Sequence, residues 1–246
     1  MALTPAVLLP LTLPGLLQHM LTTQSPTTIT TLVVCSSRDA FLHALVHAAQ
    51  RQEAEDAGSL ERLLTPTLHN LFTAKDVRLA FCPSLQVLLA NLSAMKVTAS
   101  SAVSGDERRP RMVLVNPLAL HASTPAYSAQ GLSRTFAAAV DTASKLGAEL
   151  IMVECLGMRR EVHLQDEEND QDAAMGHVEA EEDLPSAVED DPWDQDLSIL
   201  NVSAPRFGSG SGERAWAGRT VKAKTVAGRW FRFQHLAGAQ GSQRPE

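Results

Sequence analysis

Residues 111–116, with the sequence RMVLVN, begin the unit that decides the fold of this chain. They form an apolar run with the length and branching of a strand that is buried on both faces. In residues 126–147 apolar side chains recur at three- and four-residue spacing, which predicts a helix that ends at Gly147. Residues 149–154 (ELIMVE) predict a second buried strand. Strand, helix and strand together predict a βαβ unit, which belongs to a parallel sheet.

The regions on either side of this unit extend the same architecture. Two β-branched or apolar runs on the N-terminal side are each followed by a segment with helical spacing. The predicted strands there are 30–35 and 77–82, and the predicted helices are 38–46, 60–72 (interrupted near Pro66) and 85–92. On the C-terminal side, strands are predicted at 197–202, 215–226 and 229–233. The sequence therefore predicts an α/β fold: a mostly parallel sheet flanked by helices, with a C-terminal antiparallel β segment.

The charge of the chain is concentrated in one segment. The formal net charge is −7, yet residues 161–196 hold 15 acidic side chains and no lysine or arginine, so the rest of the chain is basic. Low hydrophobicity with high net charge is typical of disorder. Residues 158–192 are therefore predicted to be an acidic disordered insert. Three interpretations stay open for it: a solvated loop, a shield for the basic C-terminal region, or a docking segment for a basic partner.

These patterns divide the chain into one folded domain and three less regular parts. Residues 1–21 carry no basic side chain and contain three prolines, which argues against a signal peptide or a membrane span. The predicted parts are an N-terminal arm (1–28, with one short helix at 13–21), a βα core (29–157), the acidic insert (158–192), a closing β segment of the same domain (193–236) and a disordered tail (237–246).

The motifs of nucleotide chemistry are missing from the sequence. A phosphate-binding P-loop needs glycines, whose bare backbone N–H groups cradle the phosphates, and a lysine for their charge. No Gly-Lys dipeptide occurs, and the glycines at 208–212 follow no βα unit. Asn116 stands at the end of its strand, where a Walker B strand carries a magnesium-binding aspartate. We therefore predict a protein without ATPase activity and without a cofactor.

Other catalytic or metal-binding patterns are weak. His43 and His47 are four residues apart on a predicted helix, but no HExxH-type acidic partner accompanies them. Cys35, Cys82 and Cys155 lack CxxC spacing, and no base is fixed beside any of them. We expect reduced, buried thiols in an intracellular protein. The sequence predicts no catalytic residue and no metal site.

The C-terminal region combines cations with aromatic side chains. Trp216, Trp230, Phe231 and Phe233 alternate there with lysine and arginine. Cations neutralise phosphates and aromatic rings stack on unpaired bases, so this composition suits a nucleic-acid surface. It equally suits two strands with aromatics inward and cations in water. The candidate nucleic-acid-binding residues of this region are Arg206, Arg214, Arg219, Lys222, Lys224 and Arg229. Arg108, Arg109 and Arg111 form a second basic cluster, at the opposite edge of the predicted sheet.

The order of the predicted elements resembles the RecA-like core of strand-exchange recombinases and their paralogues, read from just after the P-loop. The resemblance covers residues 30–235 and is one of pattern and order. The strand and helix at 31–45 resemble the second pair of that core, 77–92 the next pair, and 111–116 the Walker B strand. Residues 131–155 resemble the helix and strand that follow it. Residues 192–233 resemble the closing β segment, with Trp193 before a strand and GRTVKAK at 218–224 in a hairpin.

The resemblance implies a function without catalysis. Members of this family that lack a P-loop act as non-catalytic partners, as the Shu-complex subunits do. It implies a nuclear DNA-repair accessory subunit, not an enzyme, that pairs with another RecA-like paralogue or recombinase and contacts single-stranded or forked DNA. The family's DNA-binding loop follows the strand ending near Cys155, which adds Arg159 and Arg160 to the candidates. Two alternatives stay open: a RecA-like Elongator-type subunit that contacts transfer RNA, with a cytoplasmic location, and a small α/β enzyme with an unrecognised site.

Overall fold

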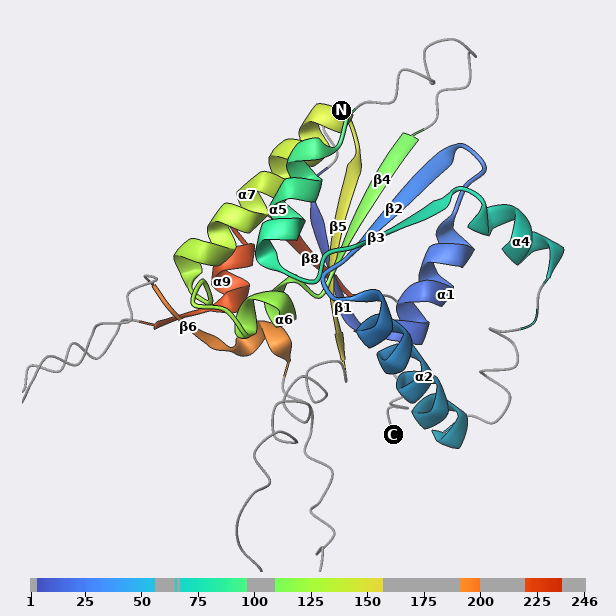
Figure 1. Cartoon of the computed structure of the whole chain (residues 1–246), viewed down its shortest axis with the longest axis horizontal. Coiled ribbons are helices and arrows are strands. Elements are labelled where there is room, and N and C mark those ends of the chain that lie inside the picture. The colour runs from blue at the N-terminus through green and yellow to red at the C-terminus, as the bar shows by residue number, and fades with distance from the viewer. Residues whose placement is uncertain are drawn as a thin grey trace, which may run out of the picture.

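The structure is a computed structural model that describes residues 4–55, 65, 67–96, 109–156, 191–199 and 220–235. Its centre is a six-stranded sheet with the order β3-β2-β4-β5-β1-β8, and every pair of neighbours in it is parallel (Figure 1). The strands are β1 (Ala6–Thr12), β2 (Thr28–Val34), β3 (Val77–Phe81), β4 (Arg109–Val115), β5 (Glu149–Leu156) and β8 (Arg232–His235). A separate antiparallel pair joins β6 (Asp196–Ser198) to β7 (Thr220–Lys222). The predicted α/β class and the C-terminal antiparallel segment are confirmed.

Helices cover both faces of the sheet. Those that follow β1 and β2 lie on one face, and those that follow β3 and β4 lie on the other (Figure 1). The first face carries α1 (Leu13–Thr23), α2 (Arg38–Glu55) and α4 (Leu68–Ala74). The second face carries α5 (Leu85–Ala94), α6 (Pro117–Ala122), α7 (Ala129–Leu146) and α9 (Ala223–Ala227). A 3-10 turn, η2 (Pro192–Asp194), precedes β6. No helix among the described residues is long and apolar enough to span a bilayer.

The predicted βαβ unit is present at β4–α7–β5. Ser128 caps α7, its hydroxyl oxygen accepting a bond from the Gly131 N–H at 3.0 Å. Gly147 ends the helix with φ of 61°, a left-handed conformation that glycine adopts without steric cost. The chain then enters β5, which pairs with β4 from Arg111↔Glu149 to Val115↔Val153. The short helix α6, which begins at Pro117, was not predicted.

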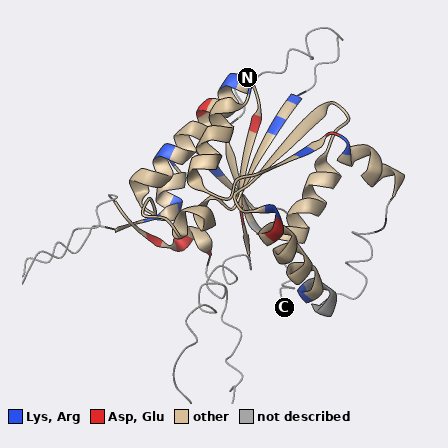
Figure 2. Cartoon of the chain, viewed as in Figure 1, with Lys and Arg blue, Asp and Glu red and all other residues tan. Residues whose placement is uncertain are grey.

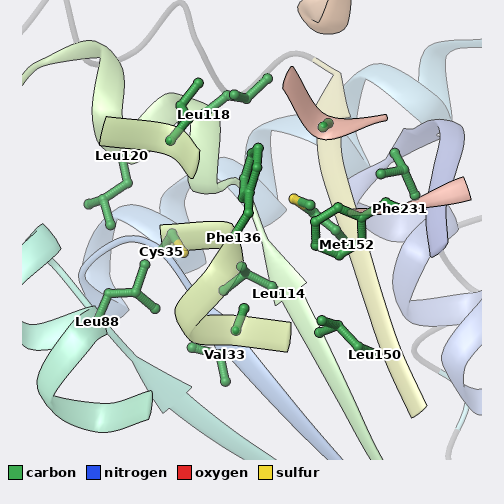
Figure 3. Close-up of a cluster of buried hydrophobic side chains, with 14 of the residues drawn as sticks. Val33, Cys35, Leu88, Leu114, Leu118, Leu120, Phe136, Leu150, Met152 and Phe231 are labelled. Carbon is green, nitrogen blue, oxygen red and sulfur yellow. The ribbon is translucent and has the colours of Figure 1, made fainter. Parts of the chain in front are cut away.

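The side chains of the central strands alternate between two cores, one on each face. Val113 and Val115 of β4 pack with α1 and α2, whereas Met112 and Leu114 pack with α5 and α7. Figure 3 shows the second of these cores, where Phe136 of α7 lies among Leu114, Met152 and Phe231. The central strands are therefore buried on both sides, which explains why they are apolar without a break in the sequence.

The prediction of an N-terminal arm was wrong at residues 6–12. These residues form β1, an interior strand that pairs with β5 on one side and β8 on the other. Proline normally excludes a segment from the middle of a sheet because it has no N–H to donate. Here the register of β1 against β5 shifts between Leu8 and Leu11, so Pro10 lies at an irregularity that tolerates it. The helix predicted at 13–21 is present as α1.

The C-terminal strands also differ from the prediction. Residues 223–226, predicted to be strand, belong to α9 (Ala223–Ala227), in which Ala223 and Ala227 are fully buried. The predicted strand at 229–233 begins only at Arg232, and it joins the main sheet parallel to β1. The predicted strand at 197–202 is β6, which ends at Ser198. Small side chains let α9 pack closely against α7, and this tertiary contact outweighs the β propensity of Thr225 and Val226.

Candidate functional site

The carboxyl edge of the sheet is where a parallel α/β fold binds its ligands. Cys35, Cys82, Asn116 and Glu154 lie at this edge, as the sequence predicted, and all four are buried. The Asn116 side-chain oxygen accepts a hydrogen bond from the Cys155 backbone N–H at 2.7 Å. The Glu154 carboxylate accepts one from the Leu118 backbone N–H at the start of α6. These polar groups bind the protein's own backbone at the point where β4 passes into α6.

The thiols at this edge are held in their neutral form. Burial raises the pKa of Cys35 and of Cys155, and the neighbouring Glu154 carboxylate raises both further. Burial also raises the pKa of Cys82. Nucleophilic and metal-binding cysteines need the thiolate, so these three residues lack the electrostatic setting of a reactive site. All three are free thiols, in agreement with the expectation of buried, reduced cysteines.

The turn between β1 and α1 is the second place to look for phosphate binding, because a P-loop joins a strand to a helix in this way. Here β1 ends at Thr12 and α1 begins at Leu13, with no loop between them. The Thr12 hydroxyl caps the helix by accepting from the Gly15 N–H at 3.2 Å. Leu13 and Leu16 are fully buried, and Pro14 has no N–H to offer. Apolar side chains and a cap therefore occupy this turn.

The histidines form no metal site within the described residues. No group of three or more His, Cys, Asp or Glu side chains there is placed to hold a metal ion. His43 and His47 are exposed on α2. His121 is fully buried between α6 and α7: its Nδ1 donates to the Ala126 carbonyl oxygen at 3.2 Å, and its Nε2 lies 2.9 Å from the Thr135 hydroxyl. Burial lowers the pKa of His121, although the bond to Ala126 opposes the shift.

Three of the eight candidate nucleic-acid-binding residues are described by the structure. Lys222 is already engaged, since its Nζ donates to the Asp194 carbonyl oxygen at 2.7 Å and to the Asp196 carboxylate at 3.1 Å. Lys224 is exposed on α9, with its Nζ 5.6 Å from the centroid of the Phe233 ring. Arg229 is exposed in the turn after α9. Arg159, Arg160, Arg206, Arg214 and Arg219 lie outside the described residues.

The described aromatic side chains of the C-terminal region pack against the core. Trp193 is fully buried and packs edge-on against Phe233, with 5.4 Å between ring centroids. Phe231 meets Phe136 of α7 in the same way at 5.5 Å. These rings are part of the core, so the described aromatics do not provide a platform on which bases stack. The arrangement is the one in which aromatics face inward and cations face water.

The described cations are spread over several elements (Figure 2). Arg111 lies at the amino edge of the sheet and forms an ion pair, in which its Nε donates to the Glu149 carboxylate at 2.8 Å. Arg109 beside it is exposed, and Arg108 lies outside the described residues. Near α9 the exposed cations are Lys224, Arg229 and also Arg232, which begins β8. Arg232 was visible in the sequence as one more cation among the C-terminal aromatics but was not singled out.

Comparisons with known proteins identify no relative of this chain. No family model, no curated protein and no solved structure matches it. At the two places where a parallel α/β fold would bind a nucleotide, side chains of this chain bond to or cap its own backbone. Exposed cations lie on α9, in the turn after it and at the start of β8.

Proposed function

We propose that this chain is a non-catalytic accessory subunit of DNA recombination and repair, a RecA-like protein that pairs with another RecA-like paralogue or a recombinase and contacts DNA. The proposal rests above all on the turn between β1 and α1. Where a P-loop protein has a glycine-rich loop between strand and helix, β1 of this chain passes directly into α1, and Leu13, Pro14 and Leu16 of α1 are buried. A RecA-like subunit with such a turn would bind partners without hydrolysing nucleotide.

The carboxyl end of β4 supports the same proposal. A magnesium-binding aspartate would stand at Asn116, but this side chain is buried and accepts a backbone N–H from β5. Asn116 is neutral and committed to a structural bond, so it is poorly suited to bind a cation. In this proposal the β4–α6 turn stabilises the fold and serves no chemical step.

The proposed DNA contact lies around α9. Lys224, Arg229 and Arg232 are exposed within a short stretch of chain, and their neighbouring aromatic residues anchor that stretch to the core. A rigid scaffold with mobile cations suits contacts to the phosphate backbone, which carry no sequence information. Lys222 would contribute less, because contacting phosphate would require it to leave the carboxylate of Asp196.

Affinity purification of the tagged full-length chain from its own cells tests the proposal, with partners identified by mass spectrometry. We expect recombinase paralogues in stoichiometric amounts. Recovery of Elongator-type RecA-like subunits would contradict the recombination function and favour transfer RNA as the nucleic acid. Recovery of no stoichiometric partner, together with activity of the isolated chain on a small molecule, would favour an enzyme. A nuclear location of the tagged protein is the second expected result.

A further inference from the structure

The helix α4 turns its apolar side chains away from the protein. Leu68, Leu71 and Phe72 are 87%, 61% and 65% exposed, whereas Asn70 and Thr73 of the same helix are half-buried. A surface helix normally does the opposite, with its apolar side on the core and its polar side in water. The three apolar residues have i, i+3, i+4 spacing and therefore form one stripe along the helix.

The sheet beside α4 is also partly uncovered. Leu79 of the edge strand β3 is 53% exposed, although Val77 and Phe81, which share its face, pack against the core beneath α1 and α2. Parallel sheets usually have helices over both faces. On the opposite face α5 and α7 provide this cover, but over Leu79 no described helix does. We call Leu68, Leu71 and Phe72 together the α4 surface.

Two cations, Lys75 and Arg78, are exposed next to α4, and one acidic side chain, the half-buried Asp76, lies between them in the chain. Neither cation forms an ion pair with a carboxylate of the described residues. The Lys75 Nζ lies 3.7 Å from the centroid of the Phe72 ring. Lys75 also continues the stripe, seven residues after Leu68. A partner that covers the stripe would bring its own side chains up to this ammonium group, and a carboxylate there would complement it.

We propose that the α4 surface is a docking site for an amphipathic helix of another protein, apolar on the side that faces α4 and acidic where it meets Lys75. A helix fits better than an extended segment because the exposed leucine and phenylalanine side chains form a helical ridge, which packs into the groove of a second helix. The inference rests on the proposed function only in requiring that the chain works with a protein partner.

Single substitutions on the α4 surface test the docking site in the complex purified from cells. Leu71→Glu and Phe72→Glu should each weaken the partner's binding at least about tenfold, because they place a carboxylate in the apolar contact. Lys75→Glu should weaken it through repulsion of the partner's acidic side chains. The matched controls are Val87→Glu, on α5 of the opposite face and 41% exposed, and Lys96→Glu, which is exposed beyond α5. Both controls should bind like the wild type, and all variants should have unchanged thermal unfolding because the positions are exposed.

A photo-crosslinking amino acid at position 72 identifies the occupant directly. We expect crosslinks to one segment of the partner with apolar residues at helical spacing and adjacent Asp or Glu. Crosslinks to a second copy of this chain, or to another segment of the same chain, would overturn the proposal. If wild type retains its partner and Leu71→Glu and Phe72→Glu do too, the docking site is wrong while the proposed function stands. If wild type has no stoichiometric partner, both fail.

Discussion

Asn116 has a left-handed backbone and a side chain that accepts a buried hydrogen bond. The backbone has φ of 59° and ψ of 45°, and the donor to the side chain is the Cys155 N–H. Asparagine tolerates this conformation better than other side chains. The residue therefore allows a sharp turn from β4 into α6 and also bonds β5 beside it. It serves the turn and the strand pairing at the same time.

Substitution of Asn116 separates these two roles. Asn116→Ala should lower the free energy of unfolding by about 2–4 kcal/mol, because it loses the hydrogen bond and retains the left-handed backbone. Asn116→Gly also loses the hydrogen bond but adopts the backbone freely, so it should be about 1 kcal/mol less destabilised than alanine. Urea unfolding of the three proteins measures both differences. Equal stability of the alanine and glycine variants would show that the left-handed backbone costs nothing here.

The buried thiols make the protein sensitive to alkali. Burial raises the pKa of Cys35, Cys82 and Cys155 above the ordinary value of 9.0 in the folded state. Below pH 9 the thiols are protonated in both states and cost nothing. Above it the unfolded chain releases these protons while the folded chain retains them, so the free energy of unfolding falls as pH rises.

Unfolding by urea at pH 8, 9 and 10 measures this loss of stability. Cys35→Ala/Cys155→Ala should lose less stability than wild type between pH 9 and 10, because two of the three thiols are gone. Both proteins should be slow to react with a thiol reagent while folded. Fast modification of all three cysteines in folded wild type at pH 8 would contradict the assignment of inert, buried thiols.

Among the elements, β1 is an interior strand of the sheet. It joins β5 to β8, and Val7 within it is fully buried. An isolated charge at such a position costs several kcal/mol, which is comparable to the whole stability of a domain. Val7→Asp should therefore prevent folding. Thr4→Asp, at an exposed residue just before the strand, should leave the protein folded. Circular dichroism of the two variants measures whether each one folds. A folded Val7→Asp would show that residues 6–12 are not an interior strand, as the prediction of an N-terminal arm had it.

The stretch around α9 makes a quantitative prediction for nucleic-acid binding. On single-stranded DNA, removing one cation that neutralises a phosphate reduces the steepness of the salt dependence by about 0.7. Lys224→Ala/Arg229→Ala should therefore reduce the slope of log affinity against log salt by about 1.4, on single-stranded DNA titrated at several salt concentrations. Lys145→Ala is the control, since this exposed lysine of α7 is paired with Asp141 at 2.5 Å. An unchanged slope in the double variant would show that these two residues do not bind phosphate.

Elements were predictable from the sequence where one local signal dominated. The βαβ unit at β4–α7–β5 was clear because the apolar spacing of residues 126–147 and the position of Gly147 indicate the same structure. The strand β1 was missed because its prolines outweighed its apolar run, and only pairing with two distant strands overrides that signal. Likewise, α9 is helical because it packs against α7, and the sequence of residues 223–227 does not indicate this contact.

For the candidate site, the sequence predicted which types of residue are present but not how their side chains are arranged. The sequence showed the cations of the C-terminal region, but the bonds of Lys222 to Asp194 and Asp196 span more than twenty residues and required the fold. The stripe of Leu68, Leu71 and Phe72 was present as spacing in the sequence. Its outward orientation was not, because spacing alone does not tell which side of a helix meets the core.

In the whole molecule, the charged residues are distributed unevenly along the chain. The net charge of −7 arises because residues 161–196 contribute 15 acidic side chains and no bases. We expect deletion of residues 161–190 to reverse the sign of the net charge and to strengthen binding to DNA at low salt, since phosphates would no longer be repelled. Binding at 50 and 200 mM salt, compared with wild type, measures the effect. Unchanged affinity at low salt would reject a shielding role for these residues.

The position of β8 beside β1 has a consequence for synthesis of the protein. The first strand of the sheet can gain its second neighbour only when residues 232–235 have left the ribosome. At translation rates of roughly 5–20 residues per second, this delay is on the order of 10–45 s. During that time the nascent chain carries an apolar strand with an unpaired edge. An apolar strand with an unpaired edge is prone to aggregate, so the interval before residues 232–235 emerge is the one in which the nascent chain is most exposed to aggregation.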